Sequence, residues 1–252
     1  MIRTIILTLF LTAYILLVGP PLLIHALLTG SSALLYRMAL GGMLFGVRMV
    51  GVRMRVEGLE NIPPGACLFA ANHTSSADAP AVVGAIPRQV AILLKESLFR
   101  WPIIGQAFRL AKFVPVRRTD RDSAMSSIER GAQGLRAGTS FLIYPEGTRS
   151  PDGRLQAFKK GAVVLAIKAG VPIVPVACAG AQKVMAKRSM VIRPGEIVVR
   201  FCAPIETTGY TVAQRDELNA VLRAALAAGL PPEQRPLDTA PAASLAGNDS
   251  LT

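Results

Sequence analysis

The sequence contains few of the residues on which disulfide frameworks, metal sites and nucleic-acid surfaces depend. Only three of its 252 residues are cysteines, Cys67, Cys178 and Cys202. Because they are odd in number and far apart, they predict neither a disulfide framework nor a metal site, and they favour a reducing compartment. Aromatic residues make up 6% of the chain, which leaves little for stacking on bases, and no nucleic-acid-binding motif is found. We therefore expect no metal, no cofactor and no nucleic-acid partner.

Histidine and acidic residues are scarce as well. One of the two histidines, His25, lies in the apolar N-terminal stretch, so His73 is the only imidazole elsewhere in the chain. The 16 Asp and Glu are outnumbered by 28 Lys and Arg, and the formal net charge is +12. Most of the excess falls in residues 101–200, with 17 basic residues against six acidic ones. A region of this kind attracts an anionic membrane or phosphorylated substrates.

Apolar residues are abundant, above all at the N-terminus. They make up 51% of the chain, and the mean hydropathy is +0.42. Residues 5–28 include no charged residue, and a continuous helix over residues 4–28 would be roughly 37 Å long, enough to cross a hydrocarbon core of about 30 Å. This segment therefore predicts attachment to a membrane. A cleavable signal peptide is the alternative, although no small-residue cleavage site directly follows the apolar run.

Two features argue against a simple membrane-spanning helix. Pro20 and Pro21 fall inside the apolar run, and prolines remove hydrogen-bond donors and kink or break a helix. A second apolar stretch, residues 33–50, contains Arg37 and Arg48, whose long side chains can extend to a membrane interface. We expect residues 1–50 to form a membrane-embedded helical hairpin, and one or two true membrane spans remain the alternative.

From residue 51 onward, short β-rich runs alternate with helical ones, which is typical of an α/β domain. We expect a mixed central sheet flanked by helices over residues 51–229, with chemistry at the strand ends. The expected strands are 66–71, 89–94, 113–116, 140–144, 173–177 and 196–201. The expected helices are 77–85, 97–111, 121–137, 158–169 and 212–228. Residues 230–252, rich in Pro, Ala, Ser and Thr, are predicted to be a disordered tail.

His73 and Asp78 form the first candidate site. His73 follows an expected strand and precedes an expected helix, and Asp78 comes five residues later. On one straight helix the two side chains would point about 140° apart, so they meet only if His73 stays in the loop and Asp78 begins the helix. The carboxylate would then orient one ring nitrogen while the other takes a proton from a hydroxyl. Taken alone, the pair is explained better by a helix-capping Asp78 and a surface His73.

The second candidate site is the polar turn at residues 144–150, which follows a strongly apolar expected strand. Gly147 permits close backbone approach, Thr148 offers a hydroxyl, and Arg149 has a planar guanidinium suited to binding phosphate through two hydrogen bonds. An ordinary Pro-Glu-Gly turn with a solvated arginine is the alternative interpretation.

Together these segments resemble the phospholipid/glycerol acyltransferase family, over roughly residues 51–228. Four blocks match the family's motifs in order. They are 72–78 (Asn-His-Thr-Ser-Ser-Ala-Asp), 113–117 (Phe-Val-Pro-Val-Arg), 145–150 (Pro-Glu-Gly-Thr-Arg-Ser) and 171–176 (Val-Pro-Ile-Val-Pro-Val). Residues 95–99 also resemble the family's Lys-x-x-Leu-Phe stretch. The chain departs from the pattern at Tyr144, where phenylalanine is more usual.

The resemblance implies an enzyme that transfers a fatty acyl group from acyl-CoA or acyl-carrier protein to the free hydroxyl of 1-acylglycerol-3-phosphate (lysophosphatidic acid), giving phosphatidic acid. His73 would be the base and Asp78 its orienting partner. The implied acceptor-binding residues are Lys95, Arg117, Glu146, Gly147, Thr148 and Arg149. No acyl-enzyme is implied, and the absence of a Gly-x-Ser-x-Gly motif agrees with that. We expect an anionic membrane as partner, and location at the inner membrane with the active site on its cytoplasmic face.

Three alternatives stay open. Another member of the family would acylate glycerol-3-phosphate, a different lysophospholipid or an amino-acid lipid. An acyltransferase of a different mechanism would use Cys67, Cys178 or Cys202 as nucleophile. A basic protein that binds anionic membranes without turnover is the alternative outside enzymology. The sequence does not specify acyl-chain length, thioester donor or oligomeric state.

Overall fold

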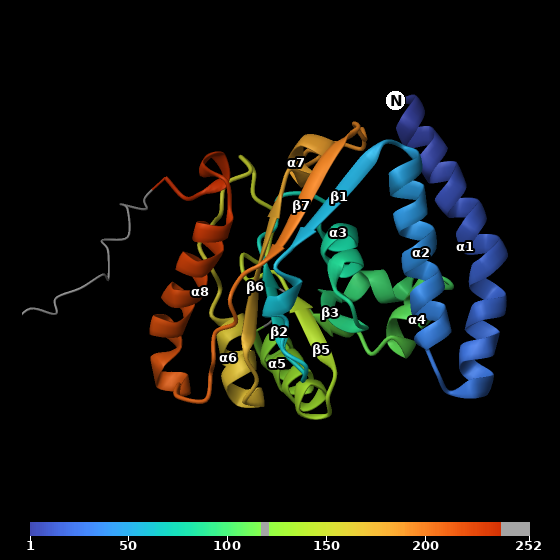
Figure 1. Ribbon diagram of the computed structural model, residues 1–252. Helices are drawn as coiled ribbons and strands as arrows, with labels where there is room; N and C mark the ends of the chain where they lie inside the picture. Colours follow the sequence, from blue (N-terminus) through green and yellow to red (C-terminus); the bar gives the residue numbers. More distant parts are fainter. Residues whose placement is uncertain (117–120, 238–252) are drawn as a thin grey trace, which may run out of the picture.

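Seven strands form one mixed sheet at the centre of the molecule, in the order β1-β7-β6-β2-β5-β3-β4 (Figure 1). The computed structural model describes residues 1–116 and 121–237. The strands are β1 (Val52–Glu57), β2 (Leu68–Ala71), β3 (Val90–Lys95), β4 (Val114–Val116), β5 (Ser140–Ile143), β6 (Ile173–Ala179) and β7 (Gly195–Phe201). The four neighbours β2, β5, β3 and β4 pair in parallel, as do β2 and β6, whereas β7 is antiparallel to β6. The carboxyl ends of five strands therefore meet at one edge of the sheet.

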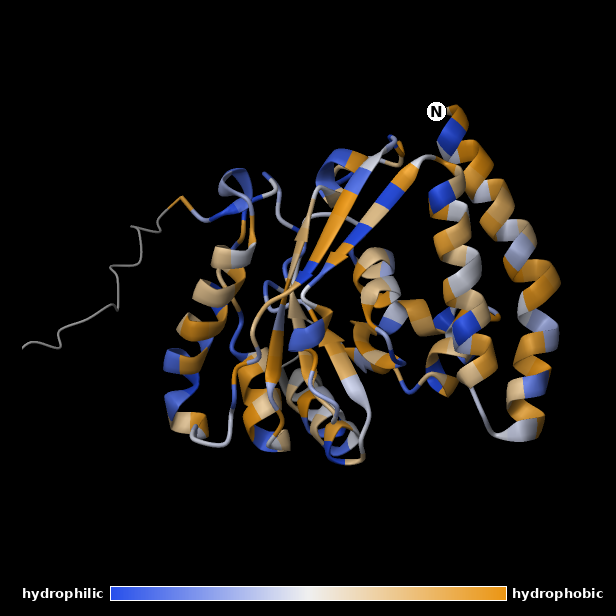
Figure 2. Ribbon diagram, viewed as in Figure 1, coloured by the Kyte–Doolittle hydropathy of each residue, from blue (hydrophilic) through white to orange (hydrophobic). Residues whose placement is uncertain are grey.

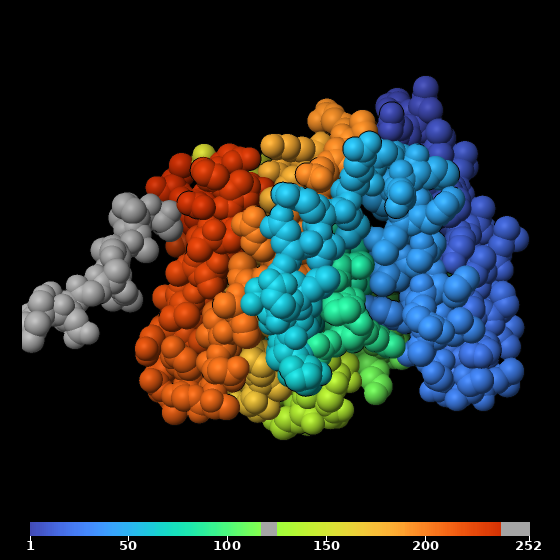
Figure 3. Space-filling model, viewed as in Figure 1, coloured from blue at the N-terminus to red at the C-terminus, as the bar shows by residue number. Residues whose placement is uncertain are grey.

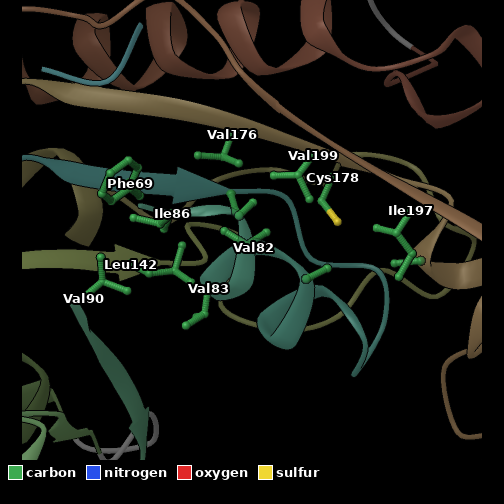
Figure 4. Packing of buried hydrophobic residues seen from close by; sticks show 14 of the residues in the cluster. Phe69, Val82, Val83, Ile86, Val90, Leu142, Val176, Cys178, Ile197 and Val199 are labelled. Carbon is green, nitrogen blue, oxygen red and sulfur yellow. The ribbon is translucent and has the colours of Figure 1, made fainter. Parts of the chain in front are cut away.

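Helices cover both faces of this sheet, which confirms the predicted α/β class. They are α1 (Ile2–Thr29), α2 (Ala33–Met49), α3 (Asp78–Ala85), α4 (Ile104–Leu110), α5 (Arg121–Arg136), α6 (Gly161–Ala169), α7 (Ala181–Val184) and α8 (Arg215–Gly229). Alternate residues of each strand face opposite sides, so the core has two apolar clusters. One lies under α3 and is shown in Figure 4, where Phe69, Leu142 and Val176 gather with Val82 and Val83. The other lies under α5, α6 and α8.

Two local expectations are corrected. The expected helix 97–111 is divided into a 3₁₀ turn, η2 (Glu96–Arg100), and α4. Trp101 between them is extended, with ψ of 133°, because a residue that precedes proline is disfavoured in the helical region. The strand β1 was not expected, although its Val-Arg-Met-Arg-Val-Glu sequence alternates with the period of a strand.

The N-terminal helix α1 runs without interruption from Ile2 to Thr29, so of the expected kink or break at Pro20 and Pro21 the break is wrong. The prolines remove two hydrogen-bond donors, but their fixed φ near −65° is itself helical. The helix has 28 residues and is long and apolar enough to cross a membrane. Its side chains are mostly exposed and apolar (Figure 2), which indicates association with a membrane.

Helix α2 lies beside α1, on the side of α1 that faces the sheet (Figure 3). The Tyr14 hydroxyl donates to the carbonyl oxygen of Met38 at 2.9 Å. Two glycines of α2 permit this close approach. A Cβ atom at Gly42 would overlap the Tyr14 ring, and one at Gly46 would lie 2.9 Å from the Phe10 ring. The two helices therefore approach closely at Gly42 and Gly46, a contact that we call the glycine seam.

Residues 230–237 pack against the domain, although their composition assigns them to the disordered tail. Leu230 is buried, and a 3₁₀ turn at Pro232–Gln234 follows it. The Gln234 carbonyl oxygen accepts a hydrogen bond from the Leu155 N–H at 2.8 Å, and its side-chain oxygen accepts one from the Gly180 N–H at 3.3 Å. The remainder of the expected tail, residues 238–252, lies outside the described residues.

The glycine seam gives a matched pair of variants. We expect Gly42→Ala to lower the free energy of unfolding by about 1–3 kcal/mol, because the added methyl group displaces the Tyr14 ring. Gly41→Ala is the control, since a Cβ atom there meets no described atom within 4 Å, and it is expected to raise stability by up to about 1 kcal/mol. Thermal unfolding in one detergent measures both, and equal effects of the two variants would contradict the seam.

Candidate active site

His73 and Asp78 lie where β2 leads into α3, with His73 in the loop and Asp78 as the first residue of the helix. This is the arrangement in which two residues five positions apart can bring their side chains together. Nδ1 of His73 is 2.9 Å from Oδ2 of Asp78, and the imidazole is 15% exposed while the carboxylate is fully buried. Because Nδ1 is engaged by the carboxylate, Nε2 is the ring nitrogen that can take a proton from a bound molecule.

Asp78 is also the centre of the loop's hydrogen bonding. Its Oδ2 accepts from the backbone N–H groups of Thr74 at 2.6 Å and Ser75 at 2.7 Å. Its Oδ1 accepts from the Thr74 hydroxyl at 3.3 Å and the Cys178 thiol at 3.6 Å. These donors offset the cost of burying a carboxylate. The capping role and the orienting role of Asp78, treated as alternatives on sequence grounds, therefore coexist.

Glu146 holds the His73 loop from the other side. Its Oε1 accepts from the His73 N–H at 2.6 Å, and its Oε2 accepts from the Gln156 N–H at 3.2 Å. The carbonyl oxygen of His73 accepts from the Ser150 N–H at 2.7 Å, so the backbone of His73 is fixed at both groups. Burial raises the pKa of Glu146 to about 7. Glu146, expected to bind the acceptor, is 3% exposed and has both oxygens on backbone donors.

Tyr144 lies against the imidazole. Its ring stacks on that of His73, with centroids 4.2 Å apart and planes inclined by 25°. Stacking of this kind restricts the imidazole to one orientation. The Tyr144 hydroxyl is buried and has no hydrogen-bond partner among the described residues. Burial, followed by the nearby negative charge of Asp78, raises the pKa of this hydroxyl well above its usual value.

Arg149 reaches the same loop. Its Nη1 donates to the Ser76 hydroxyl at 2.6 Å, so its guanidinium lies beside the segment that carries His73. Its own carbonyl oxygen accepts from Lys187 Nζ at 2.6 Å, a cation that the motifs did not indicate. Gly147 has a φ of 72°, which favours glycine, and Thr148 is exposed.

The remaining expected site residues are less closely connected to His73. Lys95 is exposed at the carboxyl end of β3, which is two strands from β2 at the same edge of the sheet. Arg117 follows β4 and lies outside the described residues. The structure therefore brings together His73, Asp78 and Arg149, and leaves Lys95 further along the edge.

Asn72 and Cys178 join the two halves of the site, and only the structure reveals this. Asn72 Nδ2 donates to the carbonyl oxygen of Cys178 at 2.9 Å, and the Cys178 N–H donates to Asn72 Oδ1 at 2.7 Å. The pair fixes the end of β2 to β6. The signal in the sequence was weak, because Asn72 was noted only as part of a motif and nothing linked it to a residue 106 positions later.

An apolar cavity of about 320 Å³ is lined on one side by Ala79, Pro80 and Val83 of α3, the helix that Asp78 begins. Its wall comes from α2, α3, β3 and α4. Larger lining residues include Tyr36, Leu40, Met43, Leu94, Phe108 and Phe113. Its walls are suited to a hydrocarbon chain and not to a polar ligand.

Comparison with known proteins identifies the family of the chain. The model of the acyltransferase family matches residues 53–179. The 1-acyl-sn-glycerol-3-phosphate acyltransferase of Limnanthes douglasii is 31% identical over 204 residues, which are 81% of this chain and 72% of the relative. The chain belongs to the acyltransferase family. The acyltransferase is therefore an enzyme of lipid metabolism.

Other members of the family extend the comparison. The human protein named 1-acyl-sn-glycerol-3-phosphate acyltransferase alpha is 31% identical over 65% of this chain and 58% of its own length. The crystal structure of the 1-acyl-sn-glycerophosphate (LPA) acyltransferase PlsC from Thermotoga maritima matches this acyltransferase with a TM-score of 0.77 and 27% identity, covering 90% of this chain and 93% of that one.

The unpartnered hydroxyl of Tyr144 gives a prediction for the acyltransferase. Tyr144→Phe removes a buried polar group that lacks a described partner and keeps the stacked ring, so we expect the free energy of unfolding to stay equal or rise by about 1–3 kcal/mol. Tyr144→Leu loses the stack and is expected to lower turnover. Denaturant unfolding and initial rates measure both effects, and a less stable Tyr144→Phe would reveal a partner for the hydroxyl.

Proposed function

We propose that this acyltransferase moves a fatty acyl group from a thioester, acyl-CoA or acyl-carrier protein, to the free hydroxyl of 1-acylglycerol-3-phosphate, giving phosphatidic acid. The contact of Arg149 with Ser76 supports the proposal, because a guanidinium is suited to binding phosphate and this one lies beside the loop of His73. The names of the relatives point to the same acceptor. Lys95 and Arg117 are proposed as further phosphate ligands.

In the proposed reaction His73 is the general base. Its Nε2 takes the proton from the acceptor hydroxyl as the hydroxyl oxygen attacks the carbonyl carbon of the thioester. The tetrahedral intermediate then breaks its C–S bond, and the departing thiolate takes the proton from the imidazolium. Asp78 keeps Nδ1 protonated and stabilises the imidazolium between these two steps. Holding the acceptor phosphate at Arg149 fixes its hydroxyl against Nε2, which reduces the entropy cost of the reaction.

The apolar cavity beside α3 is proposed to hold an acyl chain during the reaction. Residues of α2, α3, β3, η2 and α4 line it with mostly apolar side chains. A fatty chain in this cavity would lie between the domain and α2. The depth of the cavity would then set the acyl-chain length that the enzyme prefers.

A mechanism with a cysteine nucleophile has little support. Burial raises the pKa of Cys67 to about 11, and it also raises the pKa of Cys178 and Cys202. The thiolate is the nucleophilic form, so such thiols are poorly reactive near neutral pH. Direct attack by the acceptor hydroxyl needs no acyl-enzyme.

The acceptor is tested with purified enzyme, one acyl-CoA and a panel of acceptors. The panel contains 1-acylglycerol-3-phosphate, glycerol-3-phosphate, lysophospholipids with larger head groups and an amino-acid lipid. We expect the highest kcat/KM with 1-acylglycerol-3-phosphate. Acylation of another acceptor without acylation of this one would overturn the proposal, and the same panel run with acyl-carrier protein identifies the donor.

Two substitutions separate the proposed roles. His73→Ala is expected to lower kcat by about 10²–10⁴ with little change in thermal stability, because it removes the base. Its control is His25→Ala in the N-terminal helix. Arg149→Ala is expected mainly to raise KM for the acceptor, and the exposed Arg53→Ala on β1 is its control. Full turnover in His73→Ala would end the general-base mechanism.

We further propose that α1 lies in the plane of the membrane and does not cross it. A Cβ atom at Gly19 would lie 3.0 Å from Cγ2 of Ile103, so the connection before α4 packs against the middle of α1. Arg100, Arg109 and Lys112 are exposed around that connection. A crossing helix would bring these cations to the depth of the hydrocarbon, at a high cost. A position in the interface at the cytoplasmic, anionic surface avoids this cost and suits the basic domain.

Trp101 reports on this arrangement because it is the only tryptophan of the chain and is 58% exposed. With α1 in the interface plane, we expect vesicles containing anionic phosphatidylglycerol to shift its fluorescence to the blue and brominated lipids to quench it. Neutral phosphatidylcholine vesicles are the control for charge. Bound protein whose Trp101 emission does not change would contradict the in-plane arrangement.

A further inference from the structure

Cys178 is a buried thiol that the proposed reaction does not use, yet it touches the centre of the site. The residue is fully buried on β6, and its Sγ lies 3.6 Å from Oδ1 of Asp78. Its backbone is fixed by the two hydrogen bonds with Asn72. Cys178 is therefore held against the carboxylate from β6, the strand that pairs with β2.

The two oxygens of Asp78 differ in how securely they are bound. Oδ2 accepts three hydrogen bonds at 2.6–2.9 Å, from two backbone N–H groups and from His73. Oδ1 has the Thr74 hydroxyl at 3.3 Å and the Cys178 thiol. The Thr74 hydroxyl also lies 3.5 Å from Oε1 of Gln182. It has one proton and cannot donate to both acceptors, so the thiol is the donor that Oδ1 retains when Thr74 turns to Gln182.

We propose that Cys178 is a positioning residue for acyl transfer: its S–H holds Oδ1 of Asp78 and limits how strongly this carboxylate stabilises protonated His73. The inference deepens the proposed function, because it assumes that neutral His73 is the reactive form. A base that is too strongly protonated is inactive at neutral pH, and a carboxylate with fewer donors holds the imidazolium more tightly.

Other titratable groups face the same pair and are part of the argument. Tyr144 stacks on His73, Glu146 binds the His73 backbone and titrates at about pH 7, and Arg149 reaches the loop through Ser76. Burial, together with the charge of Asp78, raises the pKa of Cys178, so the thiol keeps its proton as a donor. Because Glu146 titrates in the same range as an ordinary histidine, a rate profile alone would mix the two groups.

The test therefore follows the His73 imidazole directly by NMR in the full-length protein in detergent. The chain has two histidines, so His25→Gln leaves one imidazole signal to titrate. In this background we expect Cys178→Ala to raise the pKa of His73 by about half a unit, and the rising limb of the pH–rate profile to move with it. Cys178→Ser keeps a proton donor and is expected to give a smaller upward shift, or a lower pKa. Cys202→Ala is the matched control and should leave it unchanged.

The pKa of His73 and the melting temperature together distinguish a positioning role of Cys178 from a purely structural one. A purely structural Cys178 would lower the melting temperature in both variants without moving the pKa of His73. An unchanged pKa in Cys178→Ala, or an equal shift in the alanine and serine variants, would overturn the inference. If Cys178→Ala does not fold, an upward shift in Cys178→Ser that matches or exceeds half a unit overturns it as well. The NMR titration needs no turnover, so its failure is distinct from failure to acylate 1-acylglycerol-3-phosphate.

Discussion

A buried carboxylate at the start of α3 is the constraint on which the site depends. A negative charge without solvent must be surrounded by hydrogen-bond donors, and Asp78 obtains them from the loop before it and from β6. In the conformation in which the loop supplies these donors, His73 is turned back toward the carboxylate. The stability of the loop and the orientation of the imidazole are thus two results of one requirement.

The sheet determines which segments can meet this requirement. Parallel pairing of β2 with β5 and β6 brings the ends of three strands together, although they are far apart in the chain. The His73 loop follows β2, the Arg149 turn follows β5, and Cys178 lies near the end of β6. Each of these segments is held by hydrogen bonds to its neighbours, so the site is built from loops with little freedom.

Much of this arrangement could be predicted from local patterns. The apolar runs indicated six of the seven strands, and the position of His73 between a strand and a helix specified how it could meet Asp78. Effects of tertiary contacts could not be predicted in the same way. Glu146 lies in a motif expected to bind the acceptor, but its buried carboxylate accepts hydrogen bonds from backbone N–H groups. Cys178 contacts Asp78 because β6 pairs with β2, which no local pattern predicts. Pro20 and Pro21 predicted the end of a helix from local preference, but the long apolar helix α1 continues through both prolines.

The turn at Gln234 links the order of synthesis of the chain to the order in which its loops are completed. Its backbone oxygen holds Leu155 and its side chain holds Gly180, so residues near the end of the described chain complete the support of loops in the middle. During synthesis α1 emerges before the sheet and can reach a bilayer while the later elements are still being translated. The loops at Leu155 and Gly180 receive these hydrogen bonds only when the chain beyond β7 has left the ribosome. A nascent chain would therefore dock before it becomes competent.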